Sequence, residues 1–477
     1  MLHDNCALHE LQNDVDEMSA YAESFRQQVL NHSVVELMVQ RYHQGSTPSN
    51  RTDTHKLALS IEGGGMRGAV SAGMAAALSS LGLTDTIDAV YGSSAGSVVG
   101  AYLVSRQMSL DVYYNILPNA KKTFVCKQRM IGSLVRNAIR YAVSGMFGVH
   151  SSPRAPPGMN ISFVLDGIMD STTGCRPLDA EAFARYDAIQ PLRVVASCVW
   201  SNGTLDTKCF GAEDYPHVSS SNRRGLFACL EASMTVPGAT GPPVYIDFHN
   251  DKSERGHQAK STTTAGMDNP SQSGCFFDAF CFEPLPYRSA VEEGATHVLA
   301  LQTRPAGYNA KTQPTLYEKG IAPLYFHSHR QPAVAKFFQN GGQQYRYLED
   351  YLTMEHGQQS LREPIPVPPV DLQYGCADND DGSDTIHRDT TQWRTAHILP
   401  VAVPRNTPEL PTLENDPVRV LEAVRQGFAA AYNVFAPALG LDNPGMDGMA
   451  TARELFPDEL LQSSTTPTVT LADKRLY

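Results

Sequence analysis

The pentapeptide GSSAG at Gly92–Gly96 follows the pattern G-x-S-x-G and lies between an apolar stretch and a stretch of small residues. On a sharp turn from strand to helix, such a serine projects its hydroxyl group and can act as a nucleophile, so Ser94 is the candidate. Gly92 and Gly96 would let the strand and the helix approach closely, and the helix that begins at Ala95 would favour a developing oxyanion. The plainer alternative is a tight turn in which Ser94 caps the helix.

A second glycine cluster, EGGGMRG at Glu62–Gly68, follows another apolar stretch. Consecutive glycines leave their amide N–H groups unshielded and form a site for an anion. One interpretation is the dinucleotide fingerprint G-x-G-x-x-G, which requires an acidic residue about 20 residues later, at the end of a second strand. Asp85 and Asp88 are near that distance, but they precede the next apolar strand instead of ending it.

The other interpretation of this cluster is an oxyanion hole for a tetrahedral intermediate formed at the candidate serine. The amides of Gly63, Gly64 and Gly65 would then donate to the oxyanion, and Arg67 would add positive charge beside them. No Lys-Ser or Lys-Thr pair comes directly after Gly68, which argues against nucleotide binding by a phosphate loop.

With these motifs in this order, the sequence resembles the patatin-like phospholipase family. In that family a serine works with one aspartate as a dyad, without a catalytic histidine, and the aspartate lies in a D-G-G or D-G-A motif. The matching position is Asp278, in the triplet DAF, which is followed by a Leu-Pro pair in the family's register. The segment SMTVPGATGPPVYI at 233–246 also resembles the family's approach to this aspartate, and the resemblance covers residues 56–305.

The resemblance implies that Asp278 takes the proton from Ser94 and returns it to the leaving alcohol, while the three glycines and Ala95 hold the oxyanion. A carboxylate is a weak base near neutral pH, so burial of Asp278 is expected to raise its pKa. The sequence departs from the family at two points. Ala279 replaces the usual glycine, and a long loop precedes Asp278, which makes Asp247, at the end of an apolar strand, a rival partner.

The surrounding pattern predicts the elements that must position these residues. Short apolar stretches predict strands at 56–61, 89–91, 192–200, 296–303 and 397–403. Small-residue or amphipathic stretches predict helices at 69–81, 96–104 and 287–293 and from 418 onward. Strands that alternate with helices predict a mostly parallel sheet covered on both faces. We therefore expect an α/β protein with a three-layer α/β/α patatin-like fold.

Three segments are expected along the chain. An N-terminal amphipathic helical extension covers 1–54, and a patatin-like catalytic domain covers 55–305, with an insertion loop at 249–273 that has almost no apolar residues. A C-terminal extension covers 306–477 and carries a terminal helix and a loop at 364–392, where a proline run meets an acidic patch.

The composition narrows the classes of function. A net charge of −12 over 477 residues, without a long Lys/Arg run, argues against nucleic-acid binding. Nine cysteines without a C-x-x-C pair predict neither a disulfide framework nor a zinc site, and no metal or other cofactor is expected. With no secretory leader and no stretch suited to span a membrane, the expected location is intracellular and cytoplasmic, with peripheral membrane association.

One interval, 112–165, contains basic residues but no acidic residue, with apolar residues at helical spacing. A cationic amphipathic helix lies well on an anionic lipid surface, so residues 119–148 are expected to contact a membrane or a lipid droplet. The alternative is a helix whose apolar face covers the sheet while its charges are solvated. The basic residues expected to face the lipid are Lys127, Arg129, Arg136 and Arg140.

The expected function is hydrolysis of carboxylic-ester bonds in (phospho)glycerolipids through a Ser-Asp dyad and an acyl-enzyme, as in a serine esterase of the phospholipase A type. The alternatives are an acyltransferase that uses the same dyad and a non-catalytic lipid-binding protein in which Ala279 displaces Asp278. These motifs encode neither the lipid class nor the oligomeric state.

Overall fold

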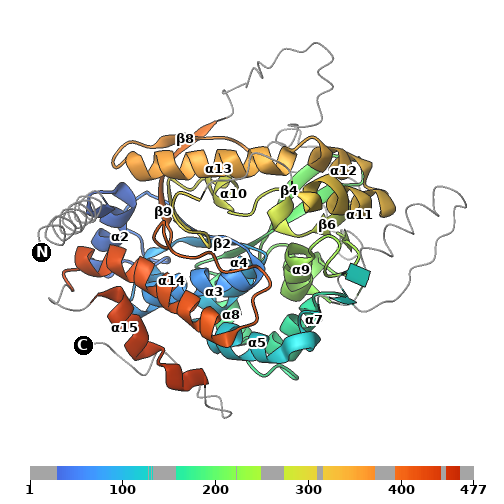
Figure 1. Ribbon diagram of the computed structural model, residues 1–477. Helices are drawn as coiled ribbons and strands as arrows, with labels where there is room; N and C mark the ends of the chain where they lie inside the picture. The colour runs from blue at the N-terminus through green and yellow to red at the C-terminus, as the bar shows by residue number, and fades with distance from the viewer. Residues whose placement is uncertain are drawn as a thin grey trace, which may run out of the picture.

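The computed structural model describes residues 29–126, 128–129, 131–132, 157–221, 223–248, 273–308, 315–370, 393–441 and 447–461. Within this part of the chain, nine strands form one sheet in the order β5-β6-β3-β2-β1-β7-β9-β8, and β4 pairs with β3 off this path (Figure 1). The central strands are parallel, namely β3 (Leu192–Trp200), β2 (Ala89–Ser93), β1 (Leu57–Ile61), β7 (His297–Leu301) and β9 (Arg394–Val401). The antiparallel strands are β4 (Leu205–Phe210), β5 (Val244–Asp247), β6 (Ser273–Phe277) and β8 (Ile365–Val367).

Helices cover both faces of the sheet. The two layers contain α3 (Gly68–Ser80), α4 (Ala95–Val104), α14 (Pro417–Ala438), α10 (Tyr287–Glu292) and α13 (Gly342–Gln359). Successive side chains of β1 point to opposite faces, so Leu57, Leu59 and Ile61 pack in one core with α3, α4 and α14. Ala58 packs in a second core with α10 and α13. Figure 1 shows α10 and α13 above the sheet and α3, α4 and α14 below it, which confirms the three-layer α/β/α fold.

The central strands and the helices between them lie within a few residues of their predicted positions, because both faces of the sheet are buried and the strands read as apolar runs. The remaining helices of eight or more residues are α2 (Ser33–His43), α8 (Ala180–Asp187), α9 (Gly225–Met234), α12 (Pro332–Gln339) and α15 (Gly448–Leu455). The shorter helices are α5 (Leu117–Ala120), α7 (Ile161–Val164) and α11 (Ala322–Ser328). Most of the predicted N-terminal extension, up to residue 28, lies outside the described residues.

The region after residue 305 is part of the same sheet. Strand β9 pairs in parallel with β7, and α14 packs against α3. The prediction of a loop at 364–392 is wrong at its start, because residues 365–367 form strand β8. Pro366 of β8 lies opposite Thr395 of β9. Proline is tolerated on an edge strand because its missing N–H faces away from the ladder. The rest of that loop, and residues 249–272 of the other predicted loop, lie outside the described residues.

Histidines gather where the N-cap of α2 and the segment before β1 meet β7 and β9. The ring centroids of His55 and His297 are 4.8 Å apart, and those of His297 and His397 are 4.6 Å apart. His32 is fully buried, and its Nε2 lies 3.2 Å from the Gly357 carbonyl oxygen. Burial is the main reason that the pKa of His32 falls to about 4 and that of His297 to about 3, and repulsion from neighbouring histidines contributes to both shifts.

These histidines predict a defined loss of stability in acid. The pKa of each buried histidine is lower in the folded protein than in the unfolded chain, where it is about 6.5. Its contribution to the free energy of unfolding is therefore present above pH 6.5 and is lost as the pH falls. For His297 the loss is about 2 kcal/mol between pH 7 and pH 5. Buried acids such as Asp278 and Glu283, whose pKa values are raised, change stability in the opposite sense. We therefore expect the His297 contribution to emerge as a difference between His297→Gln and wild type in urea unfolding at the two pH values. An equal pH dependence in both proteins would contradict the prediction.

Candidate active site

Ser94 lies at the junction of β2 and α4, in the turn predicted from G-x-S-x-G. Its backbone angles, φ 52° and ψ −122°, are rarely adopted by L-residues, as expected for a strained turn that presents a nucleophile. A Cβ atom on Gly92 would lie 2.5 Å from the Cα of Ser97, and one on Gly96 would lie 2.3 Å from the carbonyl oxygen of Ile61, so both positions require glycine. The side chain of Ser94 makes no capping hydrogen bond, unlike that of a simple helix cap.

Asp278 reaches this serine because β3 extends beyond the end of β2. Strand β2 ends opposite Val195 of β3, whereas β3 continues to Trp200 and pairs antiparallel with β6. Strand β6 therefore runs back toward the end of β2 and stops opposite Ser197, and Asp278 follows directly. The Ser94 hydroxyl donates a hydrogen bond to Oδ2 of Asp278 at 2.7 Å.

The alanine after this aspartate does not displace it. Ala279 is fully buried, and the other carboxylate oxygen of Asp278, Oδ1, accepts a hydrogen bond from the Phe280 amide at 2.9 Å. The amide of Asp278 donates to the Thr235 carbonyl oxygen at 2.9 Å, so its backbone is also fixed. The rival, Asp247, closes β5, and its side chain lies outside the described part of the structure.

The protonation of Asp278 is set by its surroundings. Its side chain is buried, and this burial raises its pKa to about 7, against opposing hydrogen bonds from the Phe280 amide and the Ser94 hydroxyl. The direction is the one expected from the sequence. A carboxyl group with this pKa can exchange a proton near neutral pH, which is the property that a general base requires.

Two further serines support the pair, and the sequence did not single them out. Ser233 of α9 accepts a hydrogen bond from the Ser94 amide at 2.9 Å and donates to the Val195 carbonyl oxygen at 2.5 Å, which ties the turn to β3. Ser197 of β3 accepts from the Phe282 amide at 3.2 Å and so anchors the chain after Asp278. A signal for Ser233 was present, because it begins the segment that resembles the family's approach to the aspartate.

The glycine turn after β1 lies beside Ser94, but its three amides are not equivalent. The Gly63 amide donates to the Pro284 carbonyl oxygen at 3.1 Å, so the prediction that it binds an oxyanion is wrong for this arrangement. Within the described residues, the amides of Gly64 and Gly65 donate to no acceptor. The amide of Ala95, at the first position of α4, has no acceptor within its helix. The candidate oxyanion donors are therefore the amides of Gly64, Gly65 and Ala95.

The sequence predicts that Arg67 adds positive charge beside the glycine amides, but in the structure this charge is paired. Its Nη1 donates to Oε1 of Glu409 at 2.5 Å, which pairs the charge with a carboxylate. The side chain instead covers the turn, because a Cβ atom on Gly64 would lie 3.0 Å from the Nε of Arg67.

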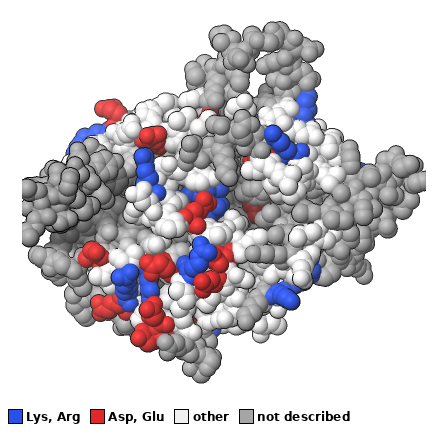
Figure 2. All heavy atoms as spheres, in the orientation of Figure 1, with Lys and Arg blue, Asp and Glu red and all other residues white. Residues whose placement is uncertain are grey.

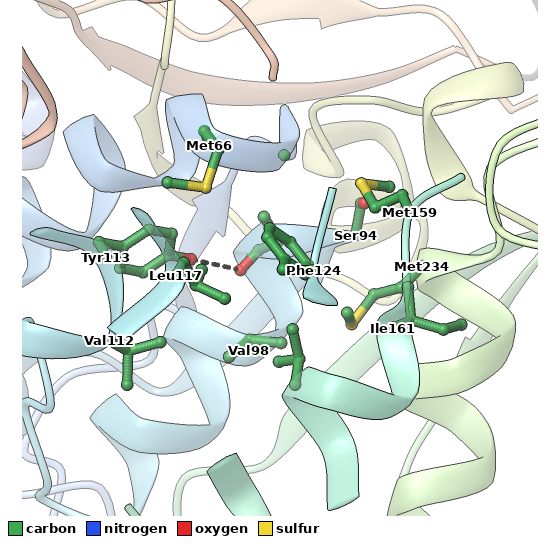
Figure 3. Close-up of a pocket in the computed structure, with 13 residues that line it drawn as sticks. Met66, Ser94, Val98, Val112, Tyr113, Leu117, Phe124, Met159, Ile161 and Met234 are labelled. Carbon is green, nitrogen blue, oxygen red and sulfur yellow. Dashed lines mark hydrogen bonds between the residues drawn. The ribbon is translucent and has the colours of Figure 1, made fainter. Parts of the chain in front are cut away.

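A cavity of about 50 Å³ opens beside Ser94. Apart from Ser94 and the Tyr113 hydroxyl, which is 3.5 Å from the Ala95 carbonyl oxygen, its side chains are apolar. Figure 3 shows Ser94 and Tyr113 on opposite sides of this space, with the side chain of Phe124 between them. The lining residues are Gly65, Met66, Ser94, Ala95, Val98, Val112, Tyr113, Leu117, Phe124, Met159, Ile161, Val164 and Met234.

The surface residues predicted to face lipid are only partly covered by the structure. Lys127, Arg136 and Arg140 lie outside the described residues, and the guanidinium group of Arg129 donates to the Lys122 carbonyl oxygen. On the face shown in Figure 2, acidic and basic side chains are interspersed among the coloured residues. No helix in the described ranges is long and apolar enough to span a bilayer. Nor do three or more His, Cys, Asp or Glu side chains in those ranges converge on a site for a metal ion.

The solved structures that are similar to this chain include a human protein and a bacterial protein. Human GIVD cytosolic phospholipase A2 is 12% identical, with a TM-score of 0.38, and the alignment covers 91% of this chain and 65% of that one. VipD from Legionella pneumophila is 13% identical, with a TM-score of 0.28, and the alignment covers 81% of this chain and 67% of that one. This chain thus spans about two thirds of each. Comparison with curated proteins found no match.

Comparison with family models gave a match over residues 59–268 to the model described as patatin-like phospholipase. The match includes Ser94, the glycine turn and Ser233, and it ends ten positions before Asp278. Within the matched range, Ser94 pairs with a buried carboxyl group beside an apolar cavity. Residues 59–268 of this chain are thus similar to the patatin-like phospholipase family.

Proposed function

We propose that the protein is a serine hydrolase that cleaves carboxylic-ester bonds of glycerolipids, with phospholipase A activity. The observation that carries the proposal is the 2.7 Å hydrogen bond from the Ser94 hydroxyl to a buried carboxylate whose pKa is raised to about 7. A nucleophile and a base within hydrogen-bonding reach are the minimum required for covalent catalysis on an ester.

In the first half of the reaction, Oγ of Ser94 attacks the ester carbonyl carbon while Asp278 takes the hydroxyl proton. The carbonyl oxygen becomes an oxyanion, and the amides of Gly64, Gly65 and Ala95 are its proposed hydrogen-bond donors. When the intermediate collapses, the bond to the leaving alcohol breaks and Asp278 returns the proton to that alcohol. An acyl group then remains on Ser94.

In the second half, a water molecule attacks the acyl-enzyme while Asp278 accepts its proton. A second tetrahedral intermediate forms at the same amides and collapses to release the fatty acid, and Asp278 returns the proton to Oγ of Ser94. No net charge or proton is gained by the enzyme over the cycle.

The apolar cavity supports an acyl chain as the group held beside Ser94. Its walls come from elements far apart in the sequence, and three of its members are methionines, whose flexible side chains can adapt to a chain of variable shape. A site whose lining is almost wholly apolar favours a hydrocarbon chain over a sugar or a peptide as its ligand.

A substitution that narrows this cavity is expected to change chain-length preference. Val98 of α4 is buried and lines the cavity, so Val98→Phe would occupy the space that an acyl chain needs. We expect the ratio of kcat/KM for an octanoyl ester to that for an acetyl ester to fall at least about tenfold. Overpacking is also expected to cost about 1–3 kcal/mol of stability. The acetyl ester is the internal control, because a general loss of folded enzyme would lower the rates for both esters equally. An unchanged ratio would show that the acyl chain does not bind in this cavity.

The direct test of the proposal is covalent labelling by a fluorophosphonate probe, followed by identification of the modified peptide. We expect wild-type protein to be labelled on Ser94 and to release fatty acid from phospholipid vesicles. Labelling at Ser94 with acyl transfer to an added alcohol, and without release of fatty acid, would replace hydrolysis with acyl transfer. Folded protein that is not labelled would indicate a lipid-binding protein on this fold.

A further inference from the structure

The segment between β9 and α14, residues 402–416, lies across the glycine turn that faces Ser94, although it is outside the part of the chain matched to the family. The Met66 amide donates to the Thr412 carbonyl oxygen at 3.0 Å. A Cβ atom on Gly65 would lie 2.8 Å from that same oxygen, so the segment fits closely against the turn. Leu410 is buried in the main core, which anchors the segment at this place.

Glu409 of this segment contacts the side chain that covers the turn. Its Oε1 accepts from Nη1 of Arg67 at 2.5 Å and lies 3.5 Å from the Nε of Arg304. The Arg67 side chain is only 10% exposed and that of Glu409 is 35% exposed, so the pair is partly shielded from water. A partly shielded pair with this geometry holds its partners more firmly than two solvated side chains would.

The other end of the turn is held by the same chain of charges. Arg304 extends its Nη1 to Oε1 of Glu62 at 3.2 Å. The other oxygen of Glu62 accepts from the Thr303 amide at 2.6 Å, and the Thr303 hydroxyl donates to the Gly63 carbonyl oxygen at 3.2 Å. Acidic and basic side chains thus alternate from Glu62 to Arg67 around the glycine turn.

We infer that Glu409 is a positioning residue for the oxyanion hole, an inference that rests on the proposed function. Three consecutive glycines have wide conformational freedom, and donors stabilise a transition state only if they are aligned before the reaction. Arg67 covers Gly64, and Glu409 fixes Arg67, so Glu409 restricts the turn to the conformation in which the amides of Gly64 and Gly65 are free to donate.

The test is the kinetics of Glu409→Ala and Glu409→Gln on a soluble short-chain ester. We expect Glu409→Ala to lower kcat about 10–100-fold while KM stays within about twofold, because the oxyanion forms only in the transition state. Glu409→Gln keeps an acceptor for Arg67 and should restore most of the rate. In the same variants, hydrogen exchange of the Met66 amide should be faster in Glu409→Ala than in wild type.

Glu414→Ala is the matched control, because Glu414 lies in the same segment but pairs with Arg419 at 2.5 Å, whereas Arg67 pairs with Glu409. Its kcat is expected to stay within about twofold of wild type. An equal loss of kcat in Glu414→Ala, a rise in KM without loss of kcat, or unchanged Met66 exchange in Glu409→Ala would overturn the inference. Wild-type protein that neither hydrolyses the ester nor reacts with the fluorophosphonate would instead reject the proposed function, before any variant is compared.

Discussion

Replacement of Ser94 by alanine is expected to reduce ester hydrolysis to background, a loss on the order of 10⁶-fold in kcat. The hydroxyl oxygen is the atom that forms the acyl-enzyme. The other hydroxyl among the described residues that line the cavity, that of Tyr113, is directed to the Ala95 carbonyl oxygen and not to a carboxylate that could activate it. The substitution removes only the hydroxyl group and its hydrogen bond to Asp278, so the fold should be retained. The measurement is the initial rate of fatty-acid release from a short-chain ester and from phospholipid vesicles.

Ser93→Ala is the control for this variant, because Ser93 is the neighbouring serine of the same turn. Its hydroxyl donates to the Glu283 carbonyl oxygen at 2.8 Å and does not face the cavity. Loss of this buried hydrogen bond should cost about 1 kcal/mol of stability, while kcat stays within about tenfold of wild type. If Ser94→Ala kept more than about 1% of wild-type activity, another nucleophile would have to be sought.

Replacement of Asp278 by asparagine is expected to lower kcat/KM about 10³–10⁴-fold, because the amide cannot accept the hydroxyl proton of Ser94. The wild-type profile should also rise with pH through about 7, since the base is active only when ionised and its pKa lies there. This rising limb should be absent from the residual activity of Asp278→Asn. The measurement is kcat/KM for a soluble ester from pH 5 to pH 9.

Stability provides the fold control for this variant. The folded pKa of Asp278 is above its unfolded value, so its contribution to stability is present at low pH and is lost as the pH rises from about 4 to about 7. Asparagine removes this penalty, so Asp278→Asn should unfold at pH 8 at a temperature no lower than wild type does. Lower stability together with lower activity would point to a structural role for the aspartate.

A second buried acid, Glu283, tests whether the rise of kcat/KM near pH 7 is due to ionisation of Asp278. Burial raises the pKa of Glu283 to about 8, and its carboxylate accepts from the Ser289 amide at 2.8 Å, away from the reacting oxygen of Ser94. Glu283→Gln is therefore expected to keep the limb near pH 7. If the limb moved in Glu283→Gln and stayed in Asp278→Asn, the assignment of the base would be wrong.

The sequence by itself determined the features that depend on neighbouring residues. The turn at Ser94 needs glycines at fixed spacing because a strand and a helix meet there at close range, and this requirement is written in five consecutive residues. The central strands were predictable because strands buried on both faces must be apolar throughout. Strand β8 was missed because a three-residue edge strand with a proline at its centre has no such signal.

Only the tertiary structure decided which partners meet across long separations. Asp278 reaches Ser94 because β3 extends beyond the end of β2 and β6 pairs antiparallel with that extension of β3. Strand length and register of this kind are not encoded by any local pattern. The Gly63 amide is taken by Pro284, and the charge of Arg67 by Glu409, 342 positions away. Hydrogen-bonding capacity can be read from residue type, but whether a donor is free or occupied depends on which distant segment packs against it.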